Sequence, residues 1–368
     1  MICYLRTSAG GFDIRLKKYI QACEYSKTPY MAVTWDRLAN AELMPHEISF
    51  HHKAPYGYGH RLKNFILLLW WYLFALKTLI IHHKKYKVIH ACNIETMPVA
   101  YFFKLFFKKK VIFDIYDTSG KAKLERFFIL RSDILILPHK KRLEQELTKE
   151  NEFNKLVVVE NVPVFNNNRQ THNGLKDINK IVLSYVGTFQ REIRGLENVL
   201  SFVLSDNRFV LEIAGSGDGF DQELQKAAKD CNRIHFYGAV NYSKALDIMQ
   251  NSDFILAQYY LNAPTHEYAS PNKYYESLFL GVPIITTHKT LVGHQVEECN
   301  SGYVIGENLE DLIILFSNID EKFIENYHKK EKAAQEKWES DYSDYLENHM
   351  INQYIHECKK VANEFNRE

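Results

Sequence analysis

The sequence lacks the short motifs on which several enzyme classes depend. Its 368 residues contain no GxSxG, HExxH or Walker pattern, so nothing indicates a serine hydrolase, a zinc peptidase or a P-loop nucleotidase. Its six cysteines form no CxxC pair, and we expect reduced thiols rather than a disulfide framework or a zinc site. The cysteines are Cys3, Cys23, Cys92, Cys231, Cys299 and Cys358.

The chain also lacks a strong overall charge and a recognisable leader. Its net charge of +1 gives no electrostatic footprint for nucleic acid. Met1 runs directly into residues 2–5, a predicted strand, so we expect no signal peptide and a cytoplasmic protein. The 16 histidines include the adjacent pairs His51-His52 and His82-His83. Adjacent residues rarely face one ion, so we expect no metal site.

Length and hydrophobic patterning predict two α/β domains. A chain of 368 residues is too long for one ordinary core. Strand-like and helix-like segments alternate in both halves, which is typical of parallel sheets covered on both faces. The predicted strands are residues 2–5, 30–34, 87–91, 110–115, 134–137, 157–159, 181–186, 209–213, 233–236, 254–257, 283–286 and 302–304. Predicted helices include residues 13–25 and 98–107, and residues 329–360 are mostly helical.

A polar, aperiodic stretch at residues 166–174 is the best linker. We therefore predict a first domain at residues 1–165, a second at 175–342, and a final helix at 343–368. Two such Rossmann-like domains place a ligand cleft between them, at the carboxyl ends of their strands.

The most informative stretch is residues 270–285. Lys273 and Glu276, three residues apart, share one face of a predicted helix that ends at Gly281. The amino end of this helix, with Ser270 and Asn272, offers unpaired N–H groups and a partial positive charge. Such a site suits a ligand with an anionic part and a hydroxyl-rich part, such as a sugar nucleotide.

Other candidate binding residues lie where predicted strands end. Arg191 and Arg194 follow a strand ending at Gly187 and Thr188, and their guanidinium groups suit diphosphate oxygens; a solvated basic loop is the alternative. The remaining candidates lie in turns that ordinary β–α connections or helix caps explain equally well. They are Gly10 and Gly11 for phosphate, Gly217, Tyr237 and Gly238 for a nucleobase, and Asp114 or Asp117 for a hydroxyl-bearing substrate.

The most hydrophobic run is residues 65–81, interrupted by Lys77. It is shorter than an uninterrupted spanning segment, which needs roughly 20 apolar residues. Residues 101–110 mix aromatic residues with lysines, a combination suited to an anionic membrane surface. Either these helices cover the sheet as buried core, or they contact a membrane peripherally.

Taken in order, these segments resemble family 4 retaining glycosyltransferases with the GT-B fold. Residues 11–15, 33–37, 88–98 and 112–117 resemble landmarks of that family's first domain. Residues 187–195 are similar to its phosphate loop, and residues 270–283 to its donor-binding helix, which is the most specific match. Trp338 and the helix after it look like the family's crossover to the first domain.

The resemblance implies transfer of a sugar from a nucleotide sugar, with UDP or GDP as the nucleotide, and retention of anomeric configuration. It implies no cofactor and no essential metal. Glu276 falls on the glutamate that holds the donor ribose, and Arg194 on the basic residue that pairs with the diphosphate. Arg191, Lys273 and Asp117 complete the expected catalytic set. The implied acceptor is a glycan or lipid-linked molecule in polysaccharide, lipopolysaccharide or capsule synthesis, at the inner face of the plasma membrane.

Three positions depart from the family pattern. A second glutamate is usual where this chain has Tyr268, a basic residue where it has Thr188, and a histidine where it has Tyr116. Two alternatives therefore stay open: a nucleotide-sugar epimerase of the same architecture, and a non-catalytic sugar-nucleotide-binding relative. An epimerase needs no large acceptor face, so residues 65–81 and 101–110 favour the transferase.

Overall fold

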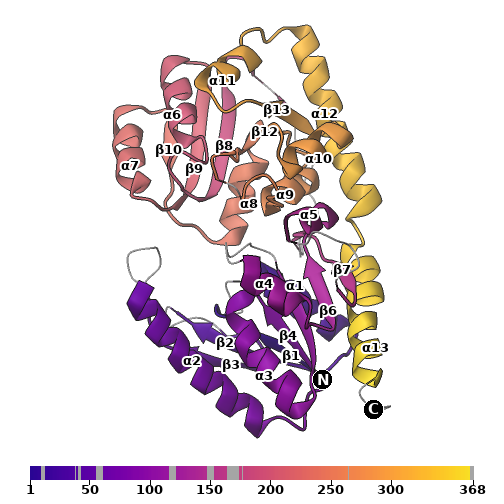
Figure 1. Ribbon diagram of the computed structural model, residues 1–368. Coiled ribbons are helices and arrows are strands. Elements are labelled where there is room, and N and C mark those ends of the chain that lie inside the picture. The colour runs from indigo at the N-terminus through magenta and orange to yellow at the C-terminus, as the bar shows by residue number, and fades with distance from the viewer. Residues whose placement is uncertain are drawn as a thin grey trace. The chain divides into compact units, whose positions relative to one another are not determined.

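The structure is a computed structural model that describes residues 1–9, 13–37, 39, 43–54, 61–115, 122–146, 153–163, 174–175, 177–263 and 265–364. It divides into two compact units. Unit 1 comprises Met1–Val164 and Asp344–Glu368, and unit 2 comprises Phe165–Ser343. Each unit has its own parallel sheet and is described by itself (Figure 1).

The sheet of unit 1 has the strand order β3-β2-β1-β4-β5-β6-β7, and every neighbouring pair is parallel. The strands are β1 (Ile2–Leu5), β2 (Tyr30–Asp36), β3 (Glu47–His51), β4 (Val88–Cys92), β5 (Lys110–Asp114), β6 (Ile134–Leu137) and β7 (Leu156–Val158). The helices are α1 (Ile14–Tyr25), α2 (Arg61–Ile81), η3 (Ile94–Thr96), α3 (Met97–Phe107), α4 (Ala122–Ile129), η4 (Lys140–Arg142), α5 (Leu143–Glu146), η6 (Leu346–Ile355) and α13 (His356–Glu364). The strand order reverses between β1 and β4, the position where parallel sheets of this kind bind ligands.

Burial explains why the central strands could be predicted. Every residue of β1, β2, β4 and β6 is buried, as expected for parallel strands covered by helices on both faces. The edge strand β3 was not predicted. This strand is short and mostly half-buried. Its sequence contains no run of apolar residues that would indicate a buried strand.

A buried polar network connects the C-terminal helices to the sheet of unit 1. Asp114, at the end of β5, accepts hydrogen bonds from Arg15 at 2.7 and 2.9 Å and from the Tyr19 hydroxyl at 2.7 Å. The Arg15 guanidinium holds the pKa of Asp114 well below its usual range despite burial. The Tyr354 hydroxyl lies 2.8 Å from His90 Nδ1, and His90 Nε2 lies 3.4 Å from Asp114. Asp114 is thus a fully buried partner of Arg15. The structure does not place it as a ligand for a substrate or as the cap of the next helix, which begins at Ala122.

Unit 2 contains a second parallel sheet with the order β10-β9-β8-β11-β12-β13. The strands are β8 (Ile181–Thr188), β9 (Phe209–Ser216), β10 (Ile234–Phe236), β11 (Phe254–Ala257), β12 (Ile284–Thr287) and β13 (Gly302–Ile305). The helices are α6 (Leu196–Ser205), α7 (Phe220–Asp230), α8 (Tyr242–Gln250), α9 (Asn272–Leu280), α10 (Leu291–Cys299), α11 (Leu309–Leu315) and α12 (Glu321–Asp341). Between β8 and β11 the strand order reverses, so this edge is the second position suited to a ligand.

Candidate functional site

The carboxyl ends of β8 and β9 are brought together by paired glycines. Gly187 and Gly215 lie opposite each other in the parallel register and have φ values of +146° and +138°. A Cβ on Gly215 would lie 1.8 Å from the Gly187 carbonyl oxygen, so only glycine fits there. Beside this pair is a pocket of about 220 Å³, small enough for one part of a larger ligand. Its lining residues are Val186, Gly187, Thr188, Ala214, Gly215, Ser216, Ala239 and Val240.

The Lys273 ammonium group provides positive charge at this edge of the sheet. Lys273 is the second residue of α9, which begins after Pro271, and its side chain is half-buried. Its Nζ lies 4.6 Å from the centre of the Tyr185 ring and would lie 2.9 Å from a Cβ on Gly187. Burial and the nearby Arg194 guanidinium lower the pKa of Lys273 to about 8. An anion bound beside Gly187 would raise the pKa of Lys273 again, because it would offset both the burial and the repulsion by Arg194.

Glu276 lies one turn further along α9 and is 5% exposed. The Tyr242 hydroxyl, from the first residue of α8, donates a hydrogen bond to Glu276 Oε1 at 2.9 Å. Burial raises the pKa of this carboxyl, although Lys273 and Tyr242 act in the opposite direction. Tyr242 therefore orients a buried carboxylate that can accept hydrogen bonds from ligand hydroxyl groups.

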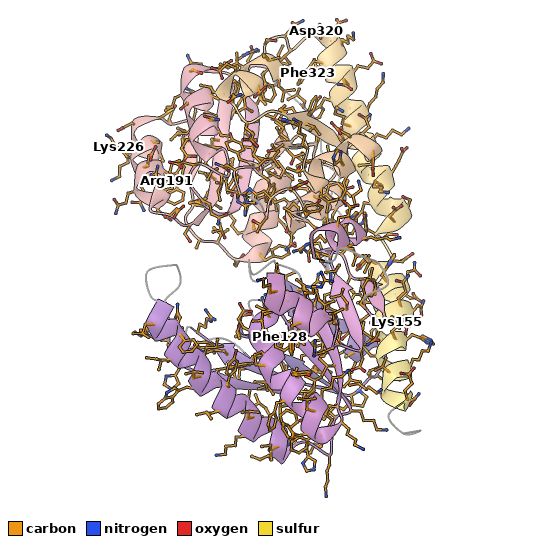
Figure 2. All side chains as sticks on the ribbon, viewed as in Figure 1. Phe128, Lys155, Arg191, Lys226, Asp320 and Phe323 are labelled. Carbon is orange, nitrogen blue, oxygen red and sulfur yellow. The ribbon has the colours of Figure 1, made fainter. Side chains whose placement is uncertain are left out.

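The two arginines of the predicted phosphate loop have different surroundings. The Arg194 guanidinium lies 4.3 Å from the Tyr259 ring centre, and its Nε donates to Gln190 Oε1 at 2.9 Å. Arg191 is exposed and forms an ion pair of 2.7 Å with Glu223 on α7 (Figure 2). Arg194 is thus close enough to lower the pKa of Lys273, whereas Arg191 pairs with an acid on the surface.

The remaining candidates of unit 2 fall into three groups. Thr188 and Gly217 lie by the glycine turn, where a Cβ on Gly217 would lie 2.5 Å from the Phe189 carbonyl oxygen. Gly238 accepts a hydrogen bond from the Gly215 N–H at 2.8 Å, while the exposed Tyr237 hydroxyl donates to Glu212 at 2.6 Å.

Two candidates lie at the start of α9. Asn272 is its first residue, and the buried Ser270 has its hydroxyl 3.3 Å from that of Tyr275. Gly10, Gly11, Tyr116 and Asp117 lie outside the described residues.

Sequence reasoning missed two polar residues that follow β11, Gln258 and His266. Gln258 is 1% exposed, and neither atom of its amide has a hydrogen-bond partner within the described residues. A Cβ on Gly195 would lie 2.3 Å from Gln258 Oε1, which explains the glycine there. His266 Nδ1 lies 2.9 Å from the Tyr260 carbonyl oxygen, so Nδ1–H donates to it. Gln258 directly follows a buried strand, and that position was the available signal.

His266 makes acid stability a testable property. Burial and Arg194 lower the pKa of His266 to about 4, against about 6.5 in an unfolded chain. Between these values the unfolded chain binds a proton that the folded chain does not, so the free energy of unfolding falls as pH drops from about 6.5 to about 4. Urea unfolding at several pH values should show this fall in the wild type and a smaller one in His266→Gln. Parallel curves would contradict the assignment.

The corresponding edge of unit 1 carries a second set of polar groups. Arg6 pairs with Asp13 at 2.5 Å, and Asp13 also caps α1 by accepting from the Leu16 N–H at 2.9 Å. Asn93 follows β4 with φ +68°, a strained value for a residue with a side chain. Asn93 Oδ1 and Glu95 Oε2 are buried and without hydrogen-bond partners in the described part of the chain.

One cluster in unit 1 has metal-ligating atom types. Ligand atoms of His90, Cys92 and Asp114 lie within 4.8 Å of one another. Both Asp114 oxygens already accept from Arg15, and burial raises the pKa of the Cys92 thiol. These atoms belong to the internal polar network and do not fit a cation.

Comparison with known proteins agrees with this geometry. Residues 180–316 match the family described as Glycosyl transferases group 1. No curated protein sequence matches the chain.

Three solved structures illustrate its structural relatives. WaaG, a glycosyltransferase involved in lipopolysaccharide biosynthesis, is 13% identical with a TM-score of 0.63, over 99% of each chain. HepE from Anabaena, in complex with UDP-glucose, is 12% identical with a TM-score of 0.61, over 100% of each chain. A protein described as a UDP-N-acetylglucosamine 2-epimerase from Listeria monocytogenes is 15% identical with a TM-score of 0.60, over 99% of this chain and 97% of that one.

These similarities extend over nearly the whole chain and confirm the predicted fold class, two Rossmann-like domains of GT-B type. The family match lies in unit 2 and includes β8, the glycine turn and α9. Together they confirm the predicted resemblance: the chain has the GT-B fold, and residues 180–316 are similar to the glycosyl transferase group 1 family.

Proposed function

We propose that this protein is a retaining, metal-independent glycosyltransferase that moves a sugar from a nucleotide sugar to a glycan or lipid-linked acceptor. The observation that carries the proposal is the buried Glu276 carboxylate, one helical turn from the Lys273 ammonium, beside the Gly187–Gly215 turn. A carboxylate suits the hydroxyl groups of a ribose, and the ammonium suits a diphosphate. The family match over residues 180–316 supports transfer as the reaction.

The proposed mechanism is electrostatic. When the bond between the sugar and the diphosphate breaks, negative charge develops on the leaving diphosphate. Lys273, Arg194 and the N–H groups at the start of α9 would stabilise that charge. Two side-chain cations and a helix amino end provide positive charge without a metal ion. Arg191, paired with Glu223, is left out of this set.

The nucleotide is proposed to be UDP, with GDP as the alternative. HepE has the same fold and forms a complex with UDP-glucose. The pocket lined by Ala214, Gly215, Ala239 and Val240 is proposed to hold the base, because the small side chains and backbone there let a flat ring approach.

The acceptor and location are inferred from unit 1. WaaG, which acts in lipopolysaccharide biosynthesis, has the same fold. Asn93 Oδ1 and Glu95 Oε2 have no hydrogen-bond partner among the described residues and lie where the strand order of the first sheet reverses, so they suit acceptor hydroxyl groups. We place the protein in the cytoplasm, peripheral on the inner face of the plasma membrane, in cell-surface glycan synthesis.

Donor affinity should depend on pH through Lys273. Only protonated Lys273 attracts the diphosphate, and its pKa is lowered to about 8. The Kd for UDP should therefore rise only about twofold from pH 7 to 8 and then by up to about tenfold per pH unit. Calorimetry at pH 8.5 in buffers of different ionisation enthalpy should also report proton uptake on binding. Lys273→Arg should remove the inflection near pH 8, and an unchanged profile in that variant would contradict the assignment.

Product analysis tests the reaction class. The full chain is incubated with UDP-glucose or GDP-mannose and a panel of octyl glycosides, and the products are examined by NMR. We expect nucleoside diphosphate release, a new glycosidic bond with the anomeric configuration of the donor, and no loss of rate in EDTA. An inverted linkage, or activity abolished by EDTA, would contradict the retaining, metal-independent mechanism.

An epimerase is the second candidate, because a protein described as a UDP-N-acetylglucosamine 2-epimerase shares the fold. The same NMR experiment, repeated with UDP-N-acetylglucosamine, distinguishes the two. An epimerase would convert UDP-N-acetylglucosamine to its C2 epimer without an acceptor, and no glycoside would form.

A further inference from the structure

Helix α2 is apolar on two opposite sides. Trp71, Ala75 and Leu79 are fully buried and belong to the core of unit 1. Trp71 Nε1 also donates a hydrogen bond to the Thr34 carbonyl oxygen at 3.1 Å. This inner side is sufficient to pack α2 on the sheet, and a surface helix of that kind normally has a polar outer side.

The outer side is instead a continuous apolar stripe. Its members recur every three or four residues, apart from the break at Lys77, so they share one face. Leu62 is 74% exposed, Trp70 58% and Leu73 68%. The outer stripe consists of Leu62, Phe65, Ile66, Leu69, Trp70, Leu73, Ile80 and Ile81. Figure 1 shows α2 along the outside of unit 1, and Figure 2 shows side chains projecting from its free side.

Helix α3, which contacts the end of α2, also exposes apolar residues. The rings of His83, just after α2, and Phe107, at the end of α3, have centres 5.7 Å apart. Leu105 and Phe106 on α3 are 57% and 69% exposed. Contiguous exposed apolar surface on this scale marks an interaction site.

The charges around the outer stripe are almost all positive. Residues 61–113 contain a single acid, Glu95, and ten basic residues. The basic residues are Arg61, Lys63, Lys77, Lys84, Lys85, Lys87, Lys104, Lys108, Lys109 and Lys110. Lys63, Lys77, Lys84, Lys85 and Lys108 are exposed. Aromatic and aliphatic groups among exposed lysines are complementary to a bilayer with anionic headgroups.

The geometry distinguishes lying on a membrane from crossing it. Residues Leu62–Ile81 are long and apolar enough to span, and only 22% of the spanning window is buried. However, spanning would withdraw Trp71, Ala75 and Leu79 from the core. It would also break the hydrogen bond that the Tyr72 hydroxyl donates to the Glu95 carbonyl oxygen at 2.8 Å. The helix must therefore keep its inner side on the sheet.

From these observations we infer that the outer stripe of α2, with Leu105 and Phe106, inserts into the headgroup region of an anionic bilayer while α2 stays packed in unit 1. The expected membrane contact is thereby assigned to a defined surface, with α2 lying in the plane of the membrane rather than crossing it. The proposed membrane-binding surface lies in unit 1, whereas Lys273 and Glu276, the residues proposed to bind the nucleotide sugar, lie in unit 2. Membrane binding and donor binding can therefore be measured separately.

Vesicle flotation of the full chain tests the inference. The probes are vesicles of phosphatidylcholine alone and of phosphatidylcholine with 30% phosphatidylglycerol. We expect the wild type to bind the anionic vesicles at least tenfold more tightly, and Phe65→Gln/Trp70→Gln/Leu73→Gln to lose at least tenfold of that affinity. The matched control is Leu204→Gln/Ile313→Gln/Ile314→Gln, three exposed apolar residues of unit 2, and it should bind as the wild type does.

Thermal unfolding and calorimetric titration with UDP accompany each protein. Thermal unfolding verifies that the variants are folded. The UDP titration reports whether the proposed nucleotide binding fails, independently of vesicle binding. Equal vesicle binding by the wild type and the α2 variant would overturn the inference, as would absence of binding by the wild type.

Two further outcomes would also overturn it. Sedimentation velocity could reveal a lipid-free dimer of the wild type that the α2 variant dissociates, with no vesicle binding, in which case a second copy covers the stripe. Retention of the wild type on vesicles in alkaline carbonate would indicate that α2 spans the bilayer, whereas the in-plane mode predicts release.

Discussion

Replacing Lys273 by alanine is expected to lower kcat/KM for the nucleotide sugar by about 10²- to 10³-fold, the usual effect of losing a group that stabilises transition-state charge. The half-buried ammonium lies at the glycine turn ending β8, where the proposed diphosphate gains charge as it leaves. Steady-state release of nucleoside diphosphate measures the effect.

The control for this prediction is Lys226→Ala, an exposed lysine on α7 of the same unit (Figure 2). It changes the net charge equally and should leave kcat/KM within about twofold. Lys273→Arg keeps the charge in a different shape and should retain part of the activity. Equal kinetics for Lys273→Ala and Lys226→Ala would show that Lys273 does not contact the donor.

Replacing Gly215 by alanine is expected to destabilise unit 2 by about 4 kcal/mol or more, or to prevent folding, because overpacking and backbone strain act together. The new Cβ would lie 1.8 Å from the Gly187 carbonyl oxygen, at a φ of +138°. Neither backbone can move without separating β8 from β9. Chemical denaturation measures the loss, and donor binding should disappear with it.

Gly219→Ala is the matched control. Gly219 also has a positive φ, +70°, but no heavy atom lies within 4 Å of its added Cβ. Only the backbone conformation is penalised, at about 1–2 kcal/mol. If Gly215→Ala were no more destabilising than Gly219→Ala, the close approach of β8 and β9 would not be a property of the protein.

The fold was predictable where burial leaves a continuous apolar signal. The segments of β1, β6 and β11 are runs of three or four apolar residues that could only be buried strands in an alternating pattern. β3 was missed because it is a short edge strand whose alternating sequence, Glu47–His51, contains no continuous apolar run. The sequence did not distinguish whether α2 is buried or faces a membrane, because a helix that is apolar on both sides fits both environments equally.

The site was predictable only where its residues are close in sequence. Lys273 and Glu276 lie on one helical turn, so their spacing placed them on one face. The Tyr242 hydrogen bond to Glu276 depends on how α8 packs, which no local pattern reports. Arg191 and Arg194 both suited a diphosphate in the sequence, and only the structure reveals the acid, Glu223, that engages Arg191.

Calorimetric titration of UDP, GDP and ADP into the folded chain, alongside Lys273→Ala and Glu276→Ala, tests the central claim most directly. The account predicts that one nucleoside diphosphate binds with 1:1 stoichiometry, and that each substitution weakens binding by about tenfold or more, as expected for a lost charged contact. No binding by the folded wild type, or equal binding by both variants, would contradict a donor site built on Lys273 and Glu276.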